Sequence, residues 1–155
     1  MARIVVDKTL TAPVEHVFEL LSDHGAYADN FRGITRSEVT REGTEENNGL
    51  GAVRAIASGP IRFEEEITAF ERPNRMDYLI VKVNAPVEHQ GGSIRLEPRG
   101  DGTHVLWTSE FTSTLRVGAR AYEAVMTRIF ARGFSMMLNR VQALHAPGSV
   151  PAVSP

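Results

Sequence analysis

The last third of the chain carries the feature that most limits the fold, a long helical pattern from Leu115 to Leu144. Its larger apolar residues recur three, four or seven positions apart, the spacing of one face of an α-helix: Tyr122, Val125, Met126, Ile129, Met136, Met137, Val141 and Leu144. At ~1.5 Å per residue, such a helix is roughly 45 Å long, too long for the edge of a small domain. The helix must therefore lie across a broad layer.

Small and flexible residues interrupt this helical pattern. Gly118 and Gly133 each cost about 1 kcal/mol of helix stability relative to alanine. Methionines such as Met126 and Met137 have flexible side chains that fill irregular space. Two interpretations remain open. Either the helix covers a hollow, or Gly133 lets a strand approach and the methionines fill an ordinary core.

The residues before this helix predict one strand, two short helices and six further strands, and hence an α+β fold. Residues 2–11 alternate between apolar and polar, as in a half-buried strand. Pro13 suits the first turn of an amphipathic helix ending near Ser22, and residues 26–31 predict a second short helix. Turn signals then recur at roughly ten-residue spacing, typical of antiparallel strands; we expect strands near 34–41, 50–57, 61–72, 75–84, 92–99 and 103–113.

The domain is predicted to end near residue 145. Residues 146–155 are rich in proline and small residues, and we expect them to form a flexible tail. The length of 155 residues is typical of a single domain with its own core.

Two turn signals predict which side chains face inward. A two-residue turn at Pro73-Asn74 pairs Glu65 with Lys82 and places both on an otherwise apolar face. Asp101-Gly102 is a type I′ hairpin signal; it pairs Leu96 with Trp107 and predicts an inward set of Ile94, Leu96, Val105, Trp107, Ser109 and Phe111. A slip of one residue would turn either set to the opposite face.

Composition excludes several function classes. The net charge of −2 provides no basic field for nucleic acid. The absence of cysteine excludes disulfides, thiolate metal sites and a cysteine nucleophile. The five histidines lack metal-site spacing, and we expect neither metal nor cofactor. No apolar stretch reaches transmembrane length, so we expect a cytosolic protein without membrane insertion. An unpaired edge strand would allow a homodimer.

Glu65 is the sharpest functional candidate, because an ionised carboxylate on an apolar face must pair, shift its pKa upward or bind something. Together with Lys82 it would orient a polar ligand group, or it would act alone as a general base. The structural alternatives are an ion pair near the rim, or a slipped register with both residues in water. Arg54 shares a strand face with apolar residues; its planar fork suits a ligand carboxylate or phenolate, and the alternative is a charge on an edge strand.

Aromatic and hydroxyl-bearing residues fall on the predicted inner face. Tyr78, Trp107, Ser109 and Tyr122 would either line a pocket or pack as ordinary core. His89 is expected in a loop from 85 to 91, where it would close a cavity mouth or remain solvated.

Three segments in this order resemble the START / Bet v 1-like (SRPBCC) superfamily, in its bacterial polyketide cyclase/dehydrase and lipid transport branch. Residues 11–23 match an "AP" step followed by an amphipathic helix that ends in aspartate. Residues 63–73 form the second match, and residues 100–111 resemble a "GDGT-x-V-x-W" hairpin. The resemblance covers residues 1 to about 145.

The resemblance implies a helix-grip fold, in which a curved antiparallel sheet of about seven strands wraps around the C-terminal helix and encloses an apolar cavity. Glu65 and His89 are the catalytic candidates. The expected ligand-binding residues are Phe31, Arg54, Phe63, Glu65, Tyr78, Ile80, Lys82, Leu96, Trp107, Ser109, Tyr122, Met126, Ile129, Gly133 and Met137.

Three functions remain open at this point. The first is a carrier or sensor of a small hydrophobic molecule that is lipid- or polyketide-like. The second is a polyketide cyclase, aromatase or dehydratase, and the third is a protein-interaction module. A family fold does not decide among them.

Overall fold

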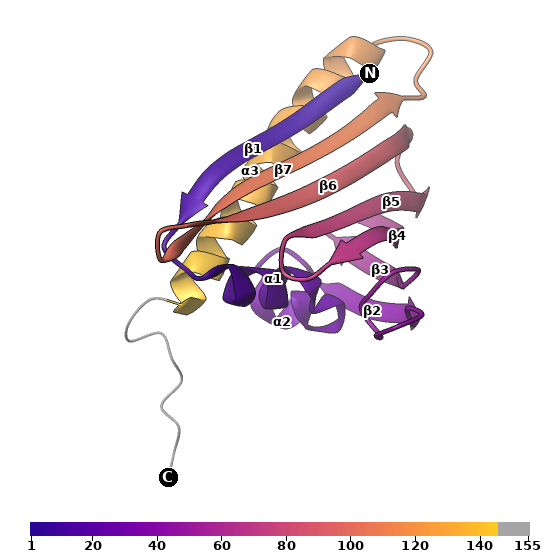
Figure 1. Ribbon diagram of the computed structural model, residues 1–155. Helices are drawn as coiled ribbons and strands as arrows, with labels where there is room; N and C mark the ends of the chain where they lie inside the picture. Colours follow the sequence, from indigo (N-terminus) through magenta and orange to yellow (C-terminus); the bar gives the residue numbers. More distant parts are fainter. Residues whose placement is uncertain (146–155) are drawn as a thin grey trace.

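A computed structural model describes residues 1–145 as a seven-stranded sheet with short helices at one end and a long helix across one face (Figure 1). The elements are β1 (Ala2–Leu10), α1 (Val14–Ser22), a 3₁₀ turn η1 (His24–Ala26), α2 (Tyr27–Asn30), β2 (Arg36–Arg41), β3 (Val53–Ser58), β4 (Ile61–Glu71), β5 (Arg75–Val83), β6 (Val87–Arg99), β7 (Gly102–Ser113) and α3 (Ala119–His145). This order confirms the predicted one. The predicted tail, 146–155, lies outside the described residues.

The antiparallel sheet has the strand order β1-β7-β6-β5-β4-β3-β2. It curves around α3, while α1 and α2 lie beside the end of the sheet where α3 finishes (Figure 1). The buried side of β7 consists of every second residue from Thr103 to Ser113. The arrangement is the expected helix-grip α+β fold, and it leaves the space between the sheet and α3 as the place for a site.

Helix α3 differs from its prediction at the start and on its faces. It begins at Ala119, after Gly118, whose φ of 76° falls in the left-handed region that glycine tolerates. Ile129, predicted to bind ligand, is 55% exposed. Phe130 and Phe134 line the inner space instead. The predicted apolar stripe was too wide, because neighbouring residues on a helix point about 100° apart.

The β4–β5 register corrects the predicted partner of Glu65. Glu71 pairs with Arg75, so the turn is longer than the predicted two residues. A register shift between Glu64 and Glu65 then places Lys82 opposite Glu64, and Lys82 is exposed. Glu65 still faces inward and is 5% exposed. Another register shift lies between Ile67 and Ala69, so that Glu65 is opposite Ile80. The extra β5 residue between Ile80 and Lys82 turns Lys82 away from the inner face.

The register of the β6–β7 hairpin differs from the predicted one, but each side chain stays on the predicted face of the sheet. Ile94 pairs with Trp107 and Leu96 with Val105, two residues away from the predicted register. Because side chains alternate with a period of two, this displacement leaves the same residues inside. All six residues predicted to face inward are buried.

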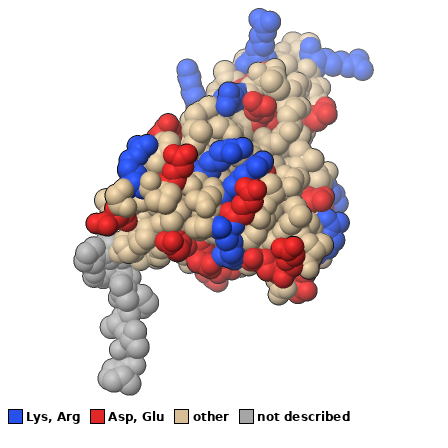
Figure 2. Space-filling model, in the orientation of Figure 1, with Lys and Arg blue, Asp and Glu red and all other residues tan. Residues whose placement is uncertain are grey.

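Surface charge is mixed on the face of the molecule seen in Figure 2, where basic and acidic side chains intermingle. Basic side chains project at the end where α3 begins (Figures 1 and 2). Within residues 1–145, no helix combines the length and the apolar character needed to cross a membrane.

Candidate functional site

Two adjoining cavities lie between the inner face of the sheet and α3. The first has a volume of about 70 Å³ and the second about 160 Å³. Five residues line both cavities and form the boundary between them: Phe63, Glu65, Tyr78, Phe130 and Phe134.

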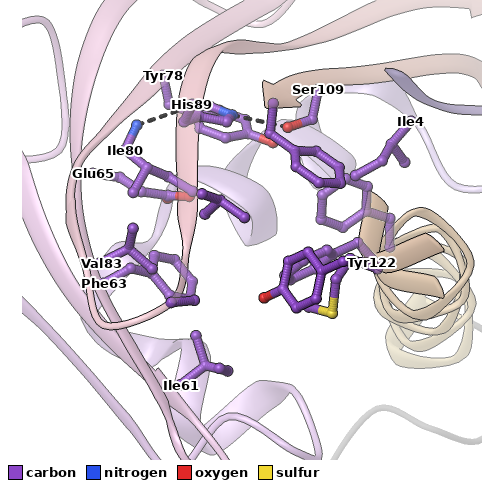
Figure 3. Close-up of a pocket in the computed structure, with 16 residues that line it drawn as sticks. Ile4, Ile61, Phe63, Glu65, Tyr78, Ile80, Val83, His89, Ser109 and Tyr122 are labelled. Atoms are coloured by element: carbon purple, nitrogen blue, oxygen red, sulfur yellow. Dashed lines mark hydrogen bonds between the residues drawn. The ribbon is translucent and has the colours of Figure 1, made fainter. Parts of the chain in front are cut away.

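The first cavity is mainly apolar. Polar atoms enter it from only a few of its lining side chains: Glu65, Tyr78, His89, Ser109 and Tyr122. Tyr122 projects from α3 into the cavity, across from Phe63 and Ile61 on β4 (Figure 3). The second cavity continues past the boundary toward Tyr27, Arg54, Trp107, Gly133 and Met137.

A buried ion pair stands at the boundary of the two cavities. Arg54 on β3 and Glu65 on β4 are directly opposed in the sheet and are 2% and 5% exposed. The Nε of Arg54 donates to Oε2 of Glu65 at 2.6 Å, and Nη2 lies 2.6 Å from the same oxygen. Burial opposes the charged form of Arg54, but the Glu65 carboxylate outweighs it and raises the pKa of Arg54 above its usual range. Arg54 therefore takes the place that the sequence predicted for Lys82.

The other side of the Arg54 guanidinium is held by η1 and α2. Its Nη1 donates to Nδ1 of His24 and to the Tyr27 hydroxyl, both at 2.9 Å. Because arginine only donates, His24 carries its hydrogen on Nε2 and donates it to the Asn48 carbonyl at 2.8 Å. The Tyr27 hydroxyl donates to the Leu21 carbonyl.

His24 is uncharged in this arrangement. Burial, reinforced by the positive charge of Arg54, lowers the pKa of His24 to about 3. Among Arg54, Glu65, His24 and Tyr27, full charges are thus confined to the Arg54–Glu65 pair, and these two charges balance. The sequence prediction included neither His24 nor Tyr27, because nothing local links a helix break to a strand thirty residues away.

A second polar group involves β5, β6 and β7. His89 lies within β6 and is 9% exposed, so neither the predicted loop position nor the solvated alternative is correct. Its Nδ1 accepts the Ile80 backbone N–H at 2.9 Å, which leaves Nε2–H to donate to Ser109 Oγ at 2.9 Å (Figure 3). Burial lowers the pKa of His89 to about 4, and the imidazole is neutral.

Tyr78 connects this group to the ion pair. Its ring stacks on His89 at a centroid distance of 5.7 Å, and its hydroxyl accepts the Trp107 indole N–H at 2.8 Å. Burial, followed by the negative charge of Glu65, raises the pKa of Tyr78 well above its usual range. The ring lies over the backbone of Gly92, where an added Cβ would fall 2.1 Å from it. Glycine at this position makes room for the tyrosine.

The surroundings of Gly133 bear on the two interpretations of the helix. A Cβ added there would meet no heavy atom within 4 Å, so the glycine does not serve the approach of a strand. It lines the second cavity, as does Met137. These observations favour the interpretation in which α3 covers a hollow.

Most of the predicted ligand-binding residues line at least one of these cavities: Arg54, Phe63, Glu65, Tyr78, Ile80, Trp107, Ser109, Tyr122, Met126, Gly133 and Met137. Phe31 and Leu96 pack in the core instead, and Lys82 and Ile129 lie at the surface. Phe130 and Phe134 were missed, although their spacing of four and their proximity to Met126 and Met137 were a usable helical signal. Within residues 1–145, no three His, Cys, Asp or Glu side chains are placed to hold a metal ion.

Residues 1–144 match the family described as polyketide cyclase / dehydrase and lipid transport. The chain belongs to this family. No curated protein matches the sequence. The polyketide cyclase/dehydrase and lipid transport family thus accounts for nearly all of the described chain, as the sequence resemblance predicted.

Solved structures similar to this family member share its fold at low sequence identity. A START superfamily protein from Mycobacterium smegmatis has a TM-score of 0.77 at 12% identity, covering 93% of this chain and 99% of the other. The Zhui aromatase/cyclase from Streptomyces sp. R1128 has a TM-score of 0.69 at 19% identity, covering 96% and 98%. XoxI from Bacillus cereus has a TM-score of 0.69 at 20% identity, covering 92% and 94%. Likeness at this level establishes the fold alone.

Proposed function

We propose that this protein binds a small hydrophobic molecule, lipid- or polyketide-like, between the sheet and α3, and acts as its carrier or sensor. The observation that carries the proposal is the pair of adjoining apolar cavities with a few convergent polar groups at their boundary. Such a combination is the usual make-up of a small-molecule site. In a fully packed core, Glu65 and Tyr78 would be surrounded by other side chains, whereas both border open space here.

The hydrogen bonds of the cavity support binding over catalysis. A general base works best when its pKa lies near the operating pH. His89 has a pKa of about 4, and both of its ring nitrogens are already bonded. One carboxylate oxygen of Glu65 already accepts a hydrogen bond from Arg54. These groups are arranged to hold a molecule in place, and the cyclase or dehydratase alternative would require them to exchange protons.

The cavity volumes indicate that a larger ligand must displace side chains. Sites for drug-sized ligands have volumes of about 300–1,000 Å³, well above the volumes of about 70 Å³ and 160 Å³ found here. Phe130 and Phe134 stand between the cavities, and both belong to α3. We expect these two rings to move when a ligand occupies both cavities.

Native mass spectrometry of the freshly purified protein, compared with its denatured mass, tests the proposal. A bound mass that is lost on denaturation is the expected result. Met126→Trp should abolish it, because Met126 lines the first cavity. Val125→Trp is the matched control, since Val125 is 54% exposed on the same turn of α3. A clean unliganded mass, followed by no thermal shift with a panel of lipids and polyphenols, would contradict the proposal and favour the interaction module.

A cytosolic location and a homodimer stay predictions from the sequence. The proposal needs neither, because both cavities are lined by residues of one chain.

A further inference from the structure

We infer that the ligand is an uncharged molecule whose hydrogen-bond donor, a hydroxyl or phenol, lies between two apolar portions and donates to Glu65. This inference rests on the proposed function and narrows it to a ligand class. Its three parts are the free acceptor on Glu65, the balanced charge around it, and its position between the two cavities.

The carboxylate of Glu65 has an acceptor to spare. Both contacts from Arg54 end on Oε2. Within residues 1–145, no side-chain or backbone donor forms a hydrogen bond to Oε1. The one buried side-chain nitrogen or oxygen without a partner in these residues is His16 Nε2, so Oε1 is accessible to solvent. Glu65 lines both cavities. Oε1 is therefore open to a ligand, and an ionised carboxylate only accepts hydrogen bonds.

The charge around Glu65 disfavours an anionic ligand at this point. Nε of Arg54 donates to Glu65, Nη1 donates to His24 and Tyr27, and Nη2 lies 2.6 Å from Oε2 of Glu65. His24 and His89 are neutral. A ligand carboxylate beside Glu65 would meet a negative charge in an apolar site without a free cation to balance it. Arg32 lines the second cavity but not the first, and it is exposed, so an anion bound to it would be paired at the surface.

A ligand cation is also disfavoured, because the guanidinium of Arg54 already balances Glu65. The same guanidinium lies over the rings of Tyr27 and Tyr78, at 4.9 and 5.7 Å from their centroids. A second cation would therefore meet an occupied aromatic face and a neutralised carboxylate. A neutral donor makes the charge-assisted hydrogen bond without either cost.

The position of Glu65 places the donor in the middle of the ligand. Glu65 and Tyr78 belong to the boundary shared by the two cavities. On one side lie apolar residues such as Ile80 and Met126, and on the other Trp107 and Met137. A ligand that fills both sides has apolar portions flanking its polar group.

Trp107 offers a direct assay. It is the single tryptophan of the chain, lines the second cavity and stacks on Phe134 at a centroid distance of 4.1 Å. Its fluorescence is recorded, with the melting temperature beside it, during titration with four non-aromatic probes of equal carbon number: undecan-6-ol, undecan-6-one, undecan-1-ol and undecanoic acid. Undecan-6-one keeps the shape and position of the central group but has no hydrogen to donate.

We expect undecan-6-ol to bind most tightly, with a Kd lower than that of undecan-6-one by about tenfold or more, because the lost bond is to a charged acceptor. The double variant Arg54→Met/Glu65→Leu should still bind both but no longer distinguish them. This variant removes both charges together, so it avoids leaving one charge buried alone.

The outcomes separate the two proposals. Equal binding of the ketone, or tighter binding of undecan-1-ol or undecanoic acid, would overturn the inference and leave the proposed function standing. An undecanoic acid complex that is tighter than that of undecan-6-ol and is weakened by Arg32→Ala would assign the ligand's polar group to Arg32 and would also overturn it. If none of the four probes changes the fluorescence of Trp107 or the melting temperature, the proposed function falls for this ligand class and the inference falls with it.

Discussion

Replacing Glu65 by leucine is the most direct test of the buried ion pair. The change leaves the Arg54 guanidinium, 2% exposed, without its counter-ion. Breaking a buried pair by removing one partner costs about 3–5 kcal/mol. In a chain of this length, each kcal/mol lowers the melting temperature by about 2–4 °C, so we expect Glu65→Leu to lower it by roughly 6–20 °C.

The double variant Arg54→Met/Glu65→Leu should be more stable than Glu65→Leu alone. Replacing both charges by apolar groups of similar size is often neutral or stabilising. What remains is the loss of the donor to His24 Nδ1 and the Tyr27 hydroxyl. The Tyr27 hydroxyl keeps its hydrogen bond to the Leu21 carbonyl, so His24 Nδ1 is the buried acceptor left without a donor, which costs about 1–3 kcal/mol. The double variant should therefore lose only about 1–3 kcal/mol.

Urea unfolding followed by Trp107 fluorescence and far-UV circular dichroism measures both losses, with the urea dependence compared among variants. Glu66→Gln is the matched control on the same strand. Glu66 pairs with Arg41 at 3.3 Å, with side chains 40% and 59% exposed, and such surface pairs contribute about 0–1 kcal/mol. The reasoning is refuted if Glu65→Leu costs no more than Glu66→Gln, or if Arg54→Met and Glu65→Leu are additive.

Four further predictions follow from the same structure. Gly133→Ala should stabilise the protein by about 1 kcal/mol, because the added Cβ meets no atom within 4 Å and helix propensity improves; a lower melting temperature would show that the space is needed empty. Lowering the pH from 6.5 toward 4 should reduce stability by up to about 1.4 kcal/mol per pH unit for each of His24 and His89. The reason is that their pKa values of about 3 and about 4 lie below the unfolded value of 6.5, so only the unfolded chain gains protons. Urea unfolding at pH 7 and 5 measures this, and equal stability would contradict it. Tyr27→Phe should lower the free energy of unfolding by about 1–3 kcal/mol, because it removes a buried hydroxyl that bonds Arg54. Lys82→Ala should change the free energy of unfolding by less than about 0.5 kcal/mol. A large loss for Lys82→Ala would instead support the predicted pair of Lys82 with Glu65.

Local patterns were sufficient for the order of the elements and for most inward-facing residues. The alternation along β7 and the spacing of α1 are properties of neighbouring residues, so they survive errors elsewhere. The β6–β7 hairpin illustrates this. Its register was displaced by two residues, and every inward residue from Ile94 to Phe111 that was predicted is nevertheless buried.

The candidate site was predicted less completely, because its contacts join distant parts of the chain. Glu65 and Arg54 were each recognised as charges on apolar faces, but their pairing depends on the β3–β4 register. His89 was expected in a loop because residues 84–91 were interpreted as a break between two strands. The structure continues β6 through Gly91 and Gly92, and Gly92 accommodates the ring of Tyr78.

By itself, the sequence determined that a long helix lies over a mainly antiparallel sheet with an apolar inner face, since hydrophobic periodicity reflects burial residue by residue. Only the tertiary structure decided which partner neutralises Glu65. The register shift beside Glu65 turns Lys82 to solvent, while β3 brings Arg54 alongside Glu65. η1 and α2 then hold Nη1 of that arginine through His24 and Tyr27, while both of its contacts to Glu65 end on Oε2. Strand register and long-range packing are set by the whole chain, and no local pattern encodes them.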